Sequence, residues 1–285
     1  MDNTYTPHGH ITEYYDESYI DYRLLWSNHD NRAMHFGYYE PGIFRHARAL
    51  LNANVVLADK AELKPGERVL DAGCGVGGTS SWLAANRGVE VVGITPVASQ
   101  VAKATEIAAA RGLDQVSFAV DDYTDSSFAD ASFDVAFALE SLCHASDKAA
   151  FYNEMFRVLK PGGRLVVAEY IRADRPLSEA AEQLLNRWLE GWAIGDLGTY
   201  DEHCAWSQAA GFAETVLEDG SHYTRRSLRR LYGLSLLGIP SDFVLHRLLK
   251  LRSRAQSGNV VSARDQYRSF RQGDWYYGIL TARKQ

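Results

Sequence analysis

The stretch VLDAGCGVGG, residues 69–78, places four glycines and an aspartate directly after a short apolar run. Glycine adopts backbone conformations that other residues avoid, and it lets a ligand approach the main chain closely. A strand that ends in D-x-G-x-G-x-G and leads into a helix is typical of a nucleotide-cofactor site in an open α/β sheet. The stretch therefore predicts a sheet that binds a cofactor at the carboxyl end of its first strand.

The segment around this turn alternates strand-like apolar runs with helical segments. Its strands are almost continuously apolar, which is typical of a parallel sheet covered by helices on both faces. Because parallel crossovers are right-handed, the alternation predicts a doubly wound sheet. The expected strands are residues 68–72, 89–95, 116–120, 133–139 and 164–170, with two more at 213–218 and 275–282.

The rest of the chain is interpreted as additions to this sheet within a single domain. Residues 1–58 predict a helical, aromatic-rich cap, and residues 222–272 predict a helical insertion that covers the substrate as a lid. The cofactor-binding core then comprises residues 59–221 and 273–285. The absence of repeats, low-complexity tracts and proline-rich linkers from the sequence favours one domain.

Length and composition fit an ordinary globular protein. The 285 residues can bury a sizeable core, and 46% of them are hydrophobic. The formal net charge of −6 argues against a protein that coats nucleic acid. Because no apolar run approaches the roughly 20 residues of a spanning helix, we expect no membrane insertion. The composition is compatible with a homo-oligomer.

The cysteines and the N-terminus indicate the compartment. Cys74, Cys143 and Cys204 are an odd number without paired spacing, which argues against a disulfide framework and a thiolate metal site. The polar N-terminal residues show no basic segment followed by an apolar one, so they do not resemble a signal peptide. We therefore expect a cytoplasmic protein without a bound metal.

Two classes of cofactor are compatible with the glycine turn. A dinucleotide needs its pyrophosphate at the helix N-terminus, and Gly73, Gly75 and Gly78 satisfy the bare G-x-G-x-x-G pattern. Asp71, however, precedes the glycines and would repel a phosphate, and residues 93–96 at the end of the second strand lack the usual acid. A carboxylate at this turn instead suits a cationic ligand such as S-adenosylmethionine, with its amino group and sulfonium.

Five motifs resemble, in order and spacing, those of the class I S-adenosylmethionine-dependent methyltransferases. They are LDAGCGVGG, VVGIT, VDDYTD, LESLCH and RVLKPGGRLVVAEY, within residues 60–175. The likeness is to a small-molecule branch that includes sterol and isoprenoid C-methyltransferases and sugar O-methyltransferases. It implies a Rossmann-like, mostly parallel seven-stranded sheet with an antiparallel last strand, and S-adenosyl-L-methionine as the cofactor, converted to S-adenosyl-L-homocysteine.

The resemblance also assigns residues to the parts of this cofactor. It places the methionine part at the glycine turn, the ribose at the end of the second strand and the adenine after the third strand. The usual ribose-binding acid is absent, and a glutamine one turn further on is expected to assist. The residues implied are Asp71, Gly73, Gly75 and Gly77 for the methionine part, Ile94, Thr95 and Gln100 for the ribose, Asp122 and Tyr123 for the adenine, and Leu139 and Glu140 beneath the methyl group.

An unusually aromatic segment precedes the glycine turn. Its H-F-G-Y-Y piece resembles the segment that closes over the cofactor and helps to form the acceptor pocket in sterol and small-molecule methyltransferases. Aromatic faces attract cations, so such a pocket suits a sulfonium or a carbocation; the same side chains would equally serve core packing. The candidate acceptor-binding residues here are Tyr14, Tyr22, Trp26, His35, Phe36 and Tyr38, with Trp206 further along the chain.

Two residues are candidates for moving a proton. Glu169 stands at the carboxyl end of the fifth strand, where a dry carboxyl would have its pKa raised towards neutrality and would act as a base. His144 follows the fourth strand and is compatible either with a catalytic base or with a hydrogen-bonded loop histidine. In the sugar O-methyltransferases that the chain resembles, a histidine and an acid occupy these positions, and in alkene C-methyltransferases an acid removes the proton lost from the cation.

The predicted insertion is basic and partly apolar. Between residues 222 and 271 it carries eleven arginines and lysines against two aspartates. These cations are compatible with a solvated face or with a surface that binds a partner. They are also compatible with binding an anionic acceptor such as a diphosphate, and Arg225 and Arg226 are the candidate residues for that contact. A magnesium ion is expected only with such a diphosphate, and we interpret the D-D-x-x-D match at residues 121–125 as coincidental.

The sequence thus predicts a methyltransferase that acts on a small lipophilic molecule. The favoured acceptor is an olefinic carbon of an isoprenoid or prenyl diphosphate, methylated through a carbocation that loses its proton to Glu169. The alternative is O- or N-methylation of a natural product with His144 and Glu169 as bases. A cyclopropane synthase, a non-catalytic cofactor-binding module and a dehydrogenase are the other classes considered.

Overall fold

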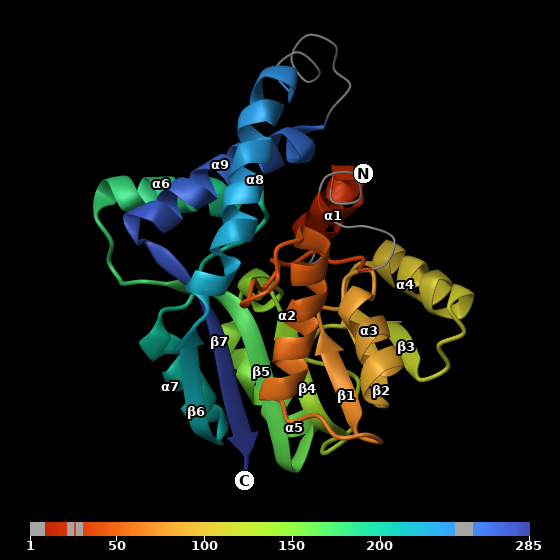
Figure 1. Cartoon of the computed structure of the whole chain (residues 1–285). Coiled ribbons are helices and arrows are strands. Elements are labelled where there is room, and N and C mark those ends of the chain that lie inside the picture. The colour runs from red at the N-terminus through yellow and green to blue at the C-terminus, as the bar shows by residue number, and fades with distance from the viewer. Residues whose placement is uncertain (1–8, 22–25, 27–30, 243–252) are drawn as a thin grey trace, which may run out of the picture.

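A single seven-stranded sheet organises the chain in the computed structural model, which describes residues 9–21, 26, 31–242 and 253–285. The strand order is β3-β2-β1-β4-β5-β7-β6, and β7 runs antiparallel to both of its neighbours (Figure 1). The predicted fold class, a doubly wound Rossmann-like sheet with an antiparallel last strand, is confirmed. The strands are β1 (Arg68–Ala72), β2 (Glu90–Thr95), β3 (Val116–Val120), β4 (Phe133–Leu139), β5 (Leu159–Arg172), β6 (Phe212–Asp219) and β7 (Trp275–Lys284).

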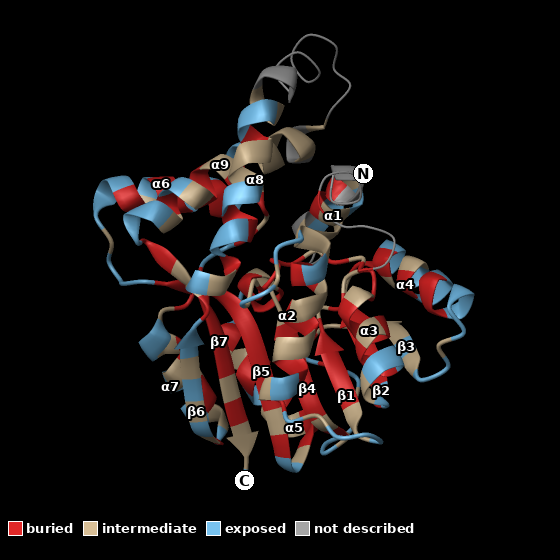
Figure 2. Cartoon of the chain, in the orientation of Figure 1, coloured by how far each residue is buried: buried red, intermediate tan, exposed pale blue. Residues whose placement is uncertain are grey.

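Side chains of alternate strand residues enter two separate hydrophobic clusters, one on each face of the sheet. Val69 of β1 belongs to the cluster that includes residues of α2 and α3, whereas the next residue, Leu70, belongs to the cluster that includes residues of α5. Figure 2 shows the resulting buried strands between partly exposed helices. The helices that flank the sheet are α2 (His46–Lys60), α3 (Gly78–Arg87), α4 (Ala98–Ala110), α5 (Lys148–Val158) and α7 (Tyr200–Ala210).

Four further helices lie beyond the carboxyl ends of the parallel strands. They are α1 (Gly9–Asp21), α6 (Glu179–Gly191), α8 (Ser221–Asp242) and α9 (Arg254–Gln272). The Tyr14 hydroxyl of α1 donates a hydrogen bond to Asn259 of α9, and Arg187 of α6 pairs with the buried Asp265 of α9. These helices therefore form a connected layer over the edge of the sheet at which a doubly wound fold binds its ligands (Figure 1).

Candidate active site

The glycine turn between β1 and α3 packs against the ends of two other strands. The N–H groups of Gly73 and Cys74 both donate to the Ile94 carbonyl at the end of β2. Gly73 has φ +94°, and a Cβ on it would collide with the Ser141 side chain after β4. Gly77 has φ +75°, and a Cβ on it would lie 2.6 Å from the Phe118 ring. Glycine is thus required at both positions, for backbone conformation and for close packing.

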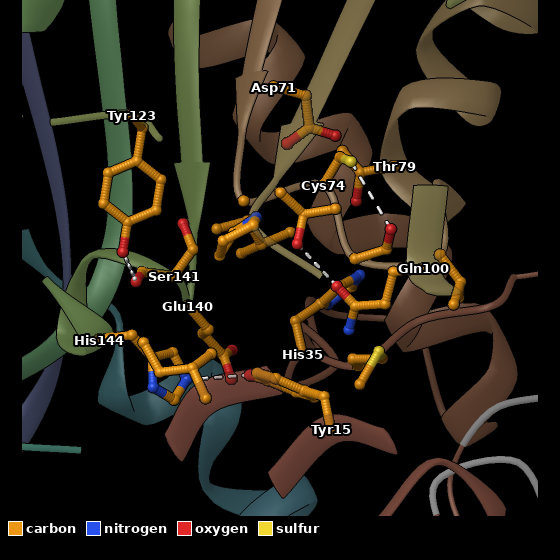
Figure 3. Close-up of a pocket in the computed structure, with 18 of the residues that line it drawn as sticks. Tyr15, His35, Asp71, Cys74, Thr79, Gln100, Tyr123, Glu140, Ser141 and His144 are labelled. Atoms are coloured by element: carbon orange, nitrogen blue, oxygen red, sulfur yellow. Dashed lines mark hydrogen bonds between the residues drawn. The ribbon is translucent and has the colours of Figure 1, made fainter. Parts of the chain in front are cut away.

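The turn opens on a cavity of about 360 Å³ at the carboxyl ends of the strands (Figure 3). Its walls come from β1, β2 and β4, from the loop after β3 and from α1. Gly77 and Ile94 do not line it, because Gly77 packs on Phe118 and Ile94 is buried in the sheet. The predicted cofactor-binding residues that do line it are Asp71, Gly73, Gly75, Thr95, Gln100, Asp122, Tyr123, Leu139 and Glu140.

Asp71 supplies a buried carboxylate at the glycine-turn end of this cavity. Its Oδ2 accepts a hydrogen bond from the Ser80 hydroxyl at 2.5 Å, and burial raises the pKa of Asp71 to about 6. An ionised carboxylate removed from water gains most from a neighbouring cation. The position therefore fits the amino group of S-adenosylmethionine and opposes a phosphate.

Polar groups for a ribose and an adenine lie along the adjoining wall. The Thr95 hydroxyl donates to Gln100 Oε1 at 2.8 Å, which orients the amide of Gln100 at the cavity. Asp122 Oδ1 accepts from the backbone N–H and the hydroxyl of Thr124, and the Tyr123 hydroxyl donates to the Ser141 carbonyl at 2.8 Å. These residues are chemically suited to the ribose hydroxyls and the adenine base for which the resemblance predicts them.

Glu140 places a second carboxyl group in the cavity, opposite Asp71 in Figure 3. It has φ +50°, an unfavourable conformation for a residue with a side chain, of the kind that occurs at functional sites. Oε1 accepts from Phe36 N at 2.7 Å and from the Tyr277 hydroxyl at 3.0 Å, and Oε2 accepts from the Tyr170 hydroxyl at 2.5 Å. Burial raises the pKa of Glu140 to about 8, so this carboxyl changes charge near neutral pH.

His144 lines the same side of the cavity, and Tyr15 of α1 reaches it (Figure 3). The ring Nδ1 lies 3.2 Å from the Ala193 carbonyl, which only accepts, so Nδ1 carries the proton. Nε2, 2.9 Å from the Tyr15 hydroxyl, is then the acceptor. Burial lowers the pKa of His144 to about 4, which keeps the imidazole neutral at physiological pH.

Glu169 differs from its predicted position. It does not line the cavity: Oε2 accepts from Cys143 N at 2.7 Å and Oε1 accepts from Tyr170 N at 2.8 Å. Alternate residues of a strand point to opposite faces, so Tyr170 reaches Glu140 while Glu169 turns to the other face. Burial raises the pKa of Glu169 to about 7. Its carboxylate therefore holds the short 3₁₀ turn η2 (Leu142–His144), and through it the position of His144.

Most of the predicted acceptor-binding aromatics pack around the site without lining the cavity. Among the members of that group that the structure describes, only His35 lines it. Trp26 donates from Nε1 to the His35 carbonyl, and Phe36 packs edge-on against Tyr170, 5.7 Å between ring centroids. Tyr38 stacks on Tyr223 of α8. Tyr14, bound to α9, belongs to the same core cluster, and Tyr22 lies outside the described residues.

Three other predictions fall away from the cavity. Trp206 packs edge-on against His203 within α7 and belongs to the opposite face of the sheet, because its helix packs with α5. Arg225 and Arg226 are exposed on the first turns of α8, and neither lines the cavity. The structure thus gives no support to Trp206 as an acceptor contact, and it places the two arginines on the outer surface.

Several cavity residues were not predicted. Tyr15 and Ile11 come from α1 and are brought in by tertiary packing, which local sequence patterns do not report. Ser141 follows Glu140 directly in the LESLCH motif, so the motif itself could have indicated it. The other additions are Arg32, Ala33, Met34, Cys74, Val76, Gly78, Thr79, Pro96, Thr124, Ala145 and Ser146.

Neither a metal site nor a spanning helix is found among the described residues. No group of three or more histidine, cysteine, aspartate or glutamate side chains in the described ranges is arranged to hold a metal ion. In the D-D-x-x-D match, Asp121 accepts from the hydroxyl and N–H of Ser127, and Asp122 accepts from Thr124. Within the same part of the chain, every helix is too short or too polar to cross a membrane.

Comparison with known proteins points to one family. Residues 63–211, about half of the chain, match the family model described as "Methyltransferase domain". A 2-methyl-6-phytyl-1,4-hydroquinone methyltransferase of Synechocystis sp. is 40% identical over 161 residues, 55% of this chain and 47% of that protein. A phosphoethanolamine N-methyltransferase of Triticum aestivum is 36% identical over 60% of this chain and 33% of its own length. The chain thus spans half or less of these two relatives.

A solved structure extends the likeness over almost the whole chain. The [4+2]-cyclase SpnF is 27% identical, with a TM-score of 0.79 over 96% of this chain and 94% of that one. The helical additions as well as the sheet are therefore part of a known architecture. The same architecture serves a cyclisation in that protein.

Proposed function

This chain belongs to the methyltransferase-domain family, and we propose that it transfers the methyl group of S-adenosylmethionine to an olefinic carbon of a lipophilic, isoprenoid-bearing acceptor. The observation that carries the proposal is Glu140, a buried carboxyl that lines the cavity and accepts hydrogen bonds from Phe36 N and from the hydroxyls of Tyr170 and Tyr277. The phytyl hydroquinone in the name of the Synechocystis relative is consistent with such an acceptor.

The described residues divide the work of binding. The bound cofactor supplies a methyl group on a positively charged sulfur. Asp71 would pair with its amino group, and Thr95, Gln100 and Asp122, which line the same cavity, would hold its hydroxyls and base. Ile11 and Tyr15 of α1 cover one side of the cavity, which limits the access of water from that side. Holding both reactants in one cavity supplies the positioning that such a displacement needs.

Glu140 and the aromatic residues that hold it serve the second half of the reaction. When the double bond of the acceptor forms the new C–C bond, the neighbouring carbon becomes a cation. The ionised Glu140 carboxylate, which lines the cavity, stabilises this charge, and the rings of Phe36, Tyr170 and Tyr277 pack behind it without lining the cavity. The Glu140 carboxylate then takes the proton from an adjacent carbon, and the electrons of that C–H bond restore a double bond. Glu140 replaces Glu169 as the base, since Glu140 lines the cavity whereas Glu169 does not and is bound to backbone N–H groups after β4 and within β5.

A second candidate is O- or N-methylation with His144 as the base. The observation in its favour is the neutral His144 imidazole, whose Nε2 accepts from Tyr15 in the cavity. An acceptor hydroxyl or ammonium in place of the Tyr15 hydroxyl would pass its proton to the same Nε2. The phosphoethanolamine N-methyltransferase relative is consistent with this chemistry.

Transfer from methyl-labelled S-adenosylmethionine to a panel of acceptors separates these functions. We expect labelling of prenyl diphosphates or prenylated hydroquinones, and loss of that labelling in Glu140→Gln but not in His144→Asn. Labelling confined to phenols, sugars or phosphoethanolamine, with the opposite pattern in the two variants, would favour the second candidate. Cofactor binding without transfer to any acceptor would contradict both and favour a cyclisation of the kind that SpnF catalyses.

A further inference from the structure

The outer surface next to the site carries arginines and an exposed aromatic ring that neither proposed reaction uses. Phe44, in the loop before α2, is 75% exposed. The Arg226 guanidinium of α8 lies 5.9 Å from the centroid of the Phe44 ring and 5.6 Å from that of Tyr39. Arg45 and Arg48, around the start of α2, are exposed beside Phe44 in the sequence. Two segments far apart in the chain thus meet in one basic and aromatic patch.

This patch continues along α8. Arg230 follows Arg226 by one turn, and its charge acts on Tyr39 and His46. Leu237 lies two turns further on the same face of the helix, because residues 226, 230 and 237 are separated by nearly whole turns. Leu237 is 78% exposed. Figure 1 shows α8 rising away from the sheet, and Arg226, Arg230 and Leu237 are all exposed on this helix.

Three arginines of the patch have no carboxylate paired with them in the described part of the chain. Arg45, Arg48 and Arg226 form no ion pair with any other residue that the structure describes. Among the described residues, the side chain of Glu40, in the same loop as Phe44, is hydrogen-bonded only to the neutral amide of Asn52 of α2, so one carboxylate stands against Arg45, Arg48 and Arg226. His46 adds no charge near neutral pH, since burial lowers its pKa to about 4. In a protein of net charge −6, this surface is therefore locally cationic.

We propose that this face, formed by Phe44, Arg45, Arg48, Arg226, Arg230 and Leu237, docks the protein on an anionic lipid bilayer. Exposed apolar side chains interspersed with arginines are typical of protein surfaces that bind at the lipid headgroups. There the aromatic rings and leucines insert at the boundary of the acyl chains, and the guanidinium groups bind the lipid phosphates. Nucleic acid would use the arginines but would leave Phe44 and Leu237 in water. The proposed partner is therefore a membrane surface, which the protein binds without spanning it.

The docking face is connected to the cavity by a short piece of chain. His35 lines the cavity and the Phe36 N–H binds Glu140, and the chain then runs through Tyr39 to Phe44. A bilayer at Phe44 would therefore lie beside the segment that closes the site. This arrangement suits a lipophilic acceptor taken from the membrane, although docking itself does not depend on the proposed reaction.

Co-sedimentation of the full chain with vesicles tests the proposal. We expect binding to phosphatidylcholine vesicles that contain phosphatidylglycerol, weakening with added salt, and little binding to pure phosphatidylcholine. Arg226→Gln should weaken partitioning about fivefold, the factor that corresponds to about 1 kcal/mol per arginine at an anionic surface. Phe44→Ser should weaken it about tenfold through lost apolar contact.

Matched variants elsewhere on the surface serve as controls. Arg111→Gln removes an exposed arginine after α4, and Val216→Ser removes an exposed apolar side chain of β6. Both should sediment like the unmodified chain, and all four variants should bind S-adenosylhomocysteine normally, which reports an intact fold. Equal binding of the unmodified chain to neutral and anionic vesicles would overturn the docking proposal. Equal effects of Arg226→Gln and Arg111→Gln on vesicle binding would overturn it as well. Vesicle binding without methyl transfer would instead contradict only the proposed reaction.

Discussion

Replacing Glu140 with glutamine is expected to lower kcat for methyl transfer about 1,000-fold, with cofactor affinity changed only a few-fold. Glutamine keeps the size of the side chain and still accepts the hydrogen bond from Phe36 N, but it cannot take a proton. Removal of a positioned general base typically costs two to four orders of magnitude in rate. Single-turnover kinetics with labelled S-adenosylmethionine and the acceptor that the panel identifies would measure the effect.

Glu169→Gln is the matched control, because it makes the same change in a neighbouring buried acid. An amide cannot accept from Cys143 N and Tyr170 N with both of its ends, so one backbone N–H loses its partner. We expect a loss of about 1–3 kcal/mol in the free energy of unfolding, measured by urea titration, and a kcat within a few-fold of the unmodified enzyme. A large loss of kcat in Glu169→Gln, with Glu140→Gln fully active, would return the base to Glu169.

Asp71→Asn is expected to raise the Kd for S-adenosylmethionine about 100-fold. The pKa of about 6 leaves Asp71 largely ionised at pH 7, and the variant removes the negative charge that faces the amino group of the cofactor. Hydrogen bonds to charged groups contribute about 1.5–3 kcal/mol, and every 1.4 kcal/mol is a factor of ten in affinity. Isothermal titration calorimetry measures the change directly.

Asp114→Asn provides the charge-matched comparison for this experiment. Asp114 is exposed in the loop before β3, so its removal changes the net charge equally without touching the cavity. Its Kd should stay within twofold of that of the unmodified chain. If Asp71→Asn bound the cofactor as tightly as Asp114→Asn does, the assignment of Asp71 to the amino group would be wrong.

The sequence predictions succeed where the information is local. The fold class follows from the alternation of apolar strands with helices, and it is confirmed. The family follows from the order and spacing of motifs that can be read from the sequence alone, and it is also confirmed. Asp71, Gly73 and Gly75, whose turn is specified within ten residues, line the cavity at the carboxyl ends of the strands, and their assignment to the cofactor stays a prediction.

The predictions differ from the structure where the position of a residue in the site depends on the direction of its side chain or on a contact between distant parts of the sequence. Glu169 is predicted to face the crevice, but alternate residues of β5 point to opposite faces, and it is the next residue, Tyr170, whose side chain reaches Glu140. Tyr15 reaches His144 across 129 positions of sequence, a contact that no local pattern reports. Trp206 was grouped with the acceptor aromatics by residue type, whereas its helix covers the other face of the sheet.

The number of protons released on cofactor binding tests the central claim, that Asp71 and Glu140 enclose a positively charged methyl donor. At pH 7 a carboxyl of pKa about 8 is mostly protonated, so a cation beside Glu140 should ionise it. Calorimetry in buffers of different ionisation enthalpy should show S-adenosylmethionine releasing close to one proton more than S-adenosylhomocysteine, and Glu140→Gln should abolish the difference. Equal proton release by the two ligands in the unmodified chain would contradict the account.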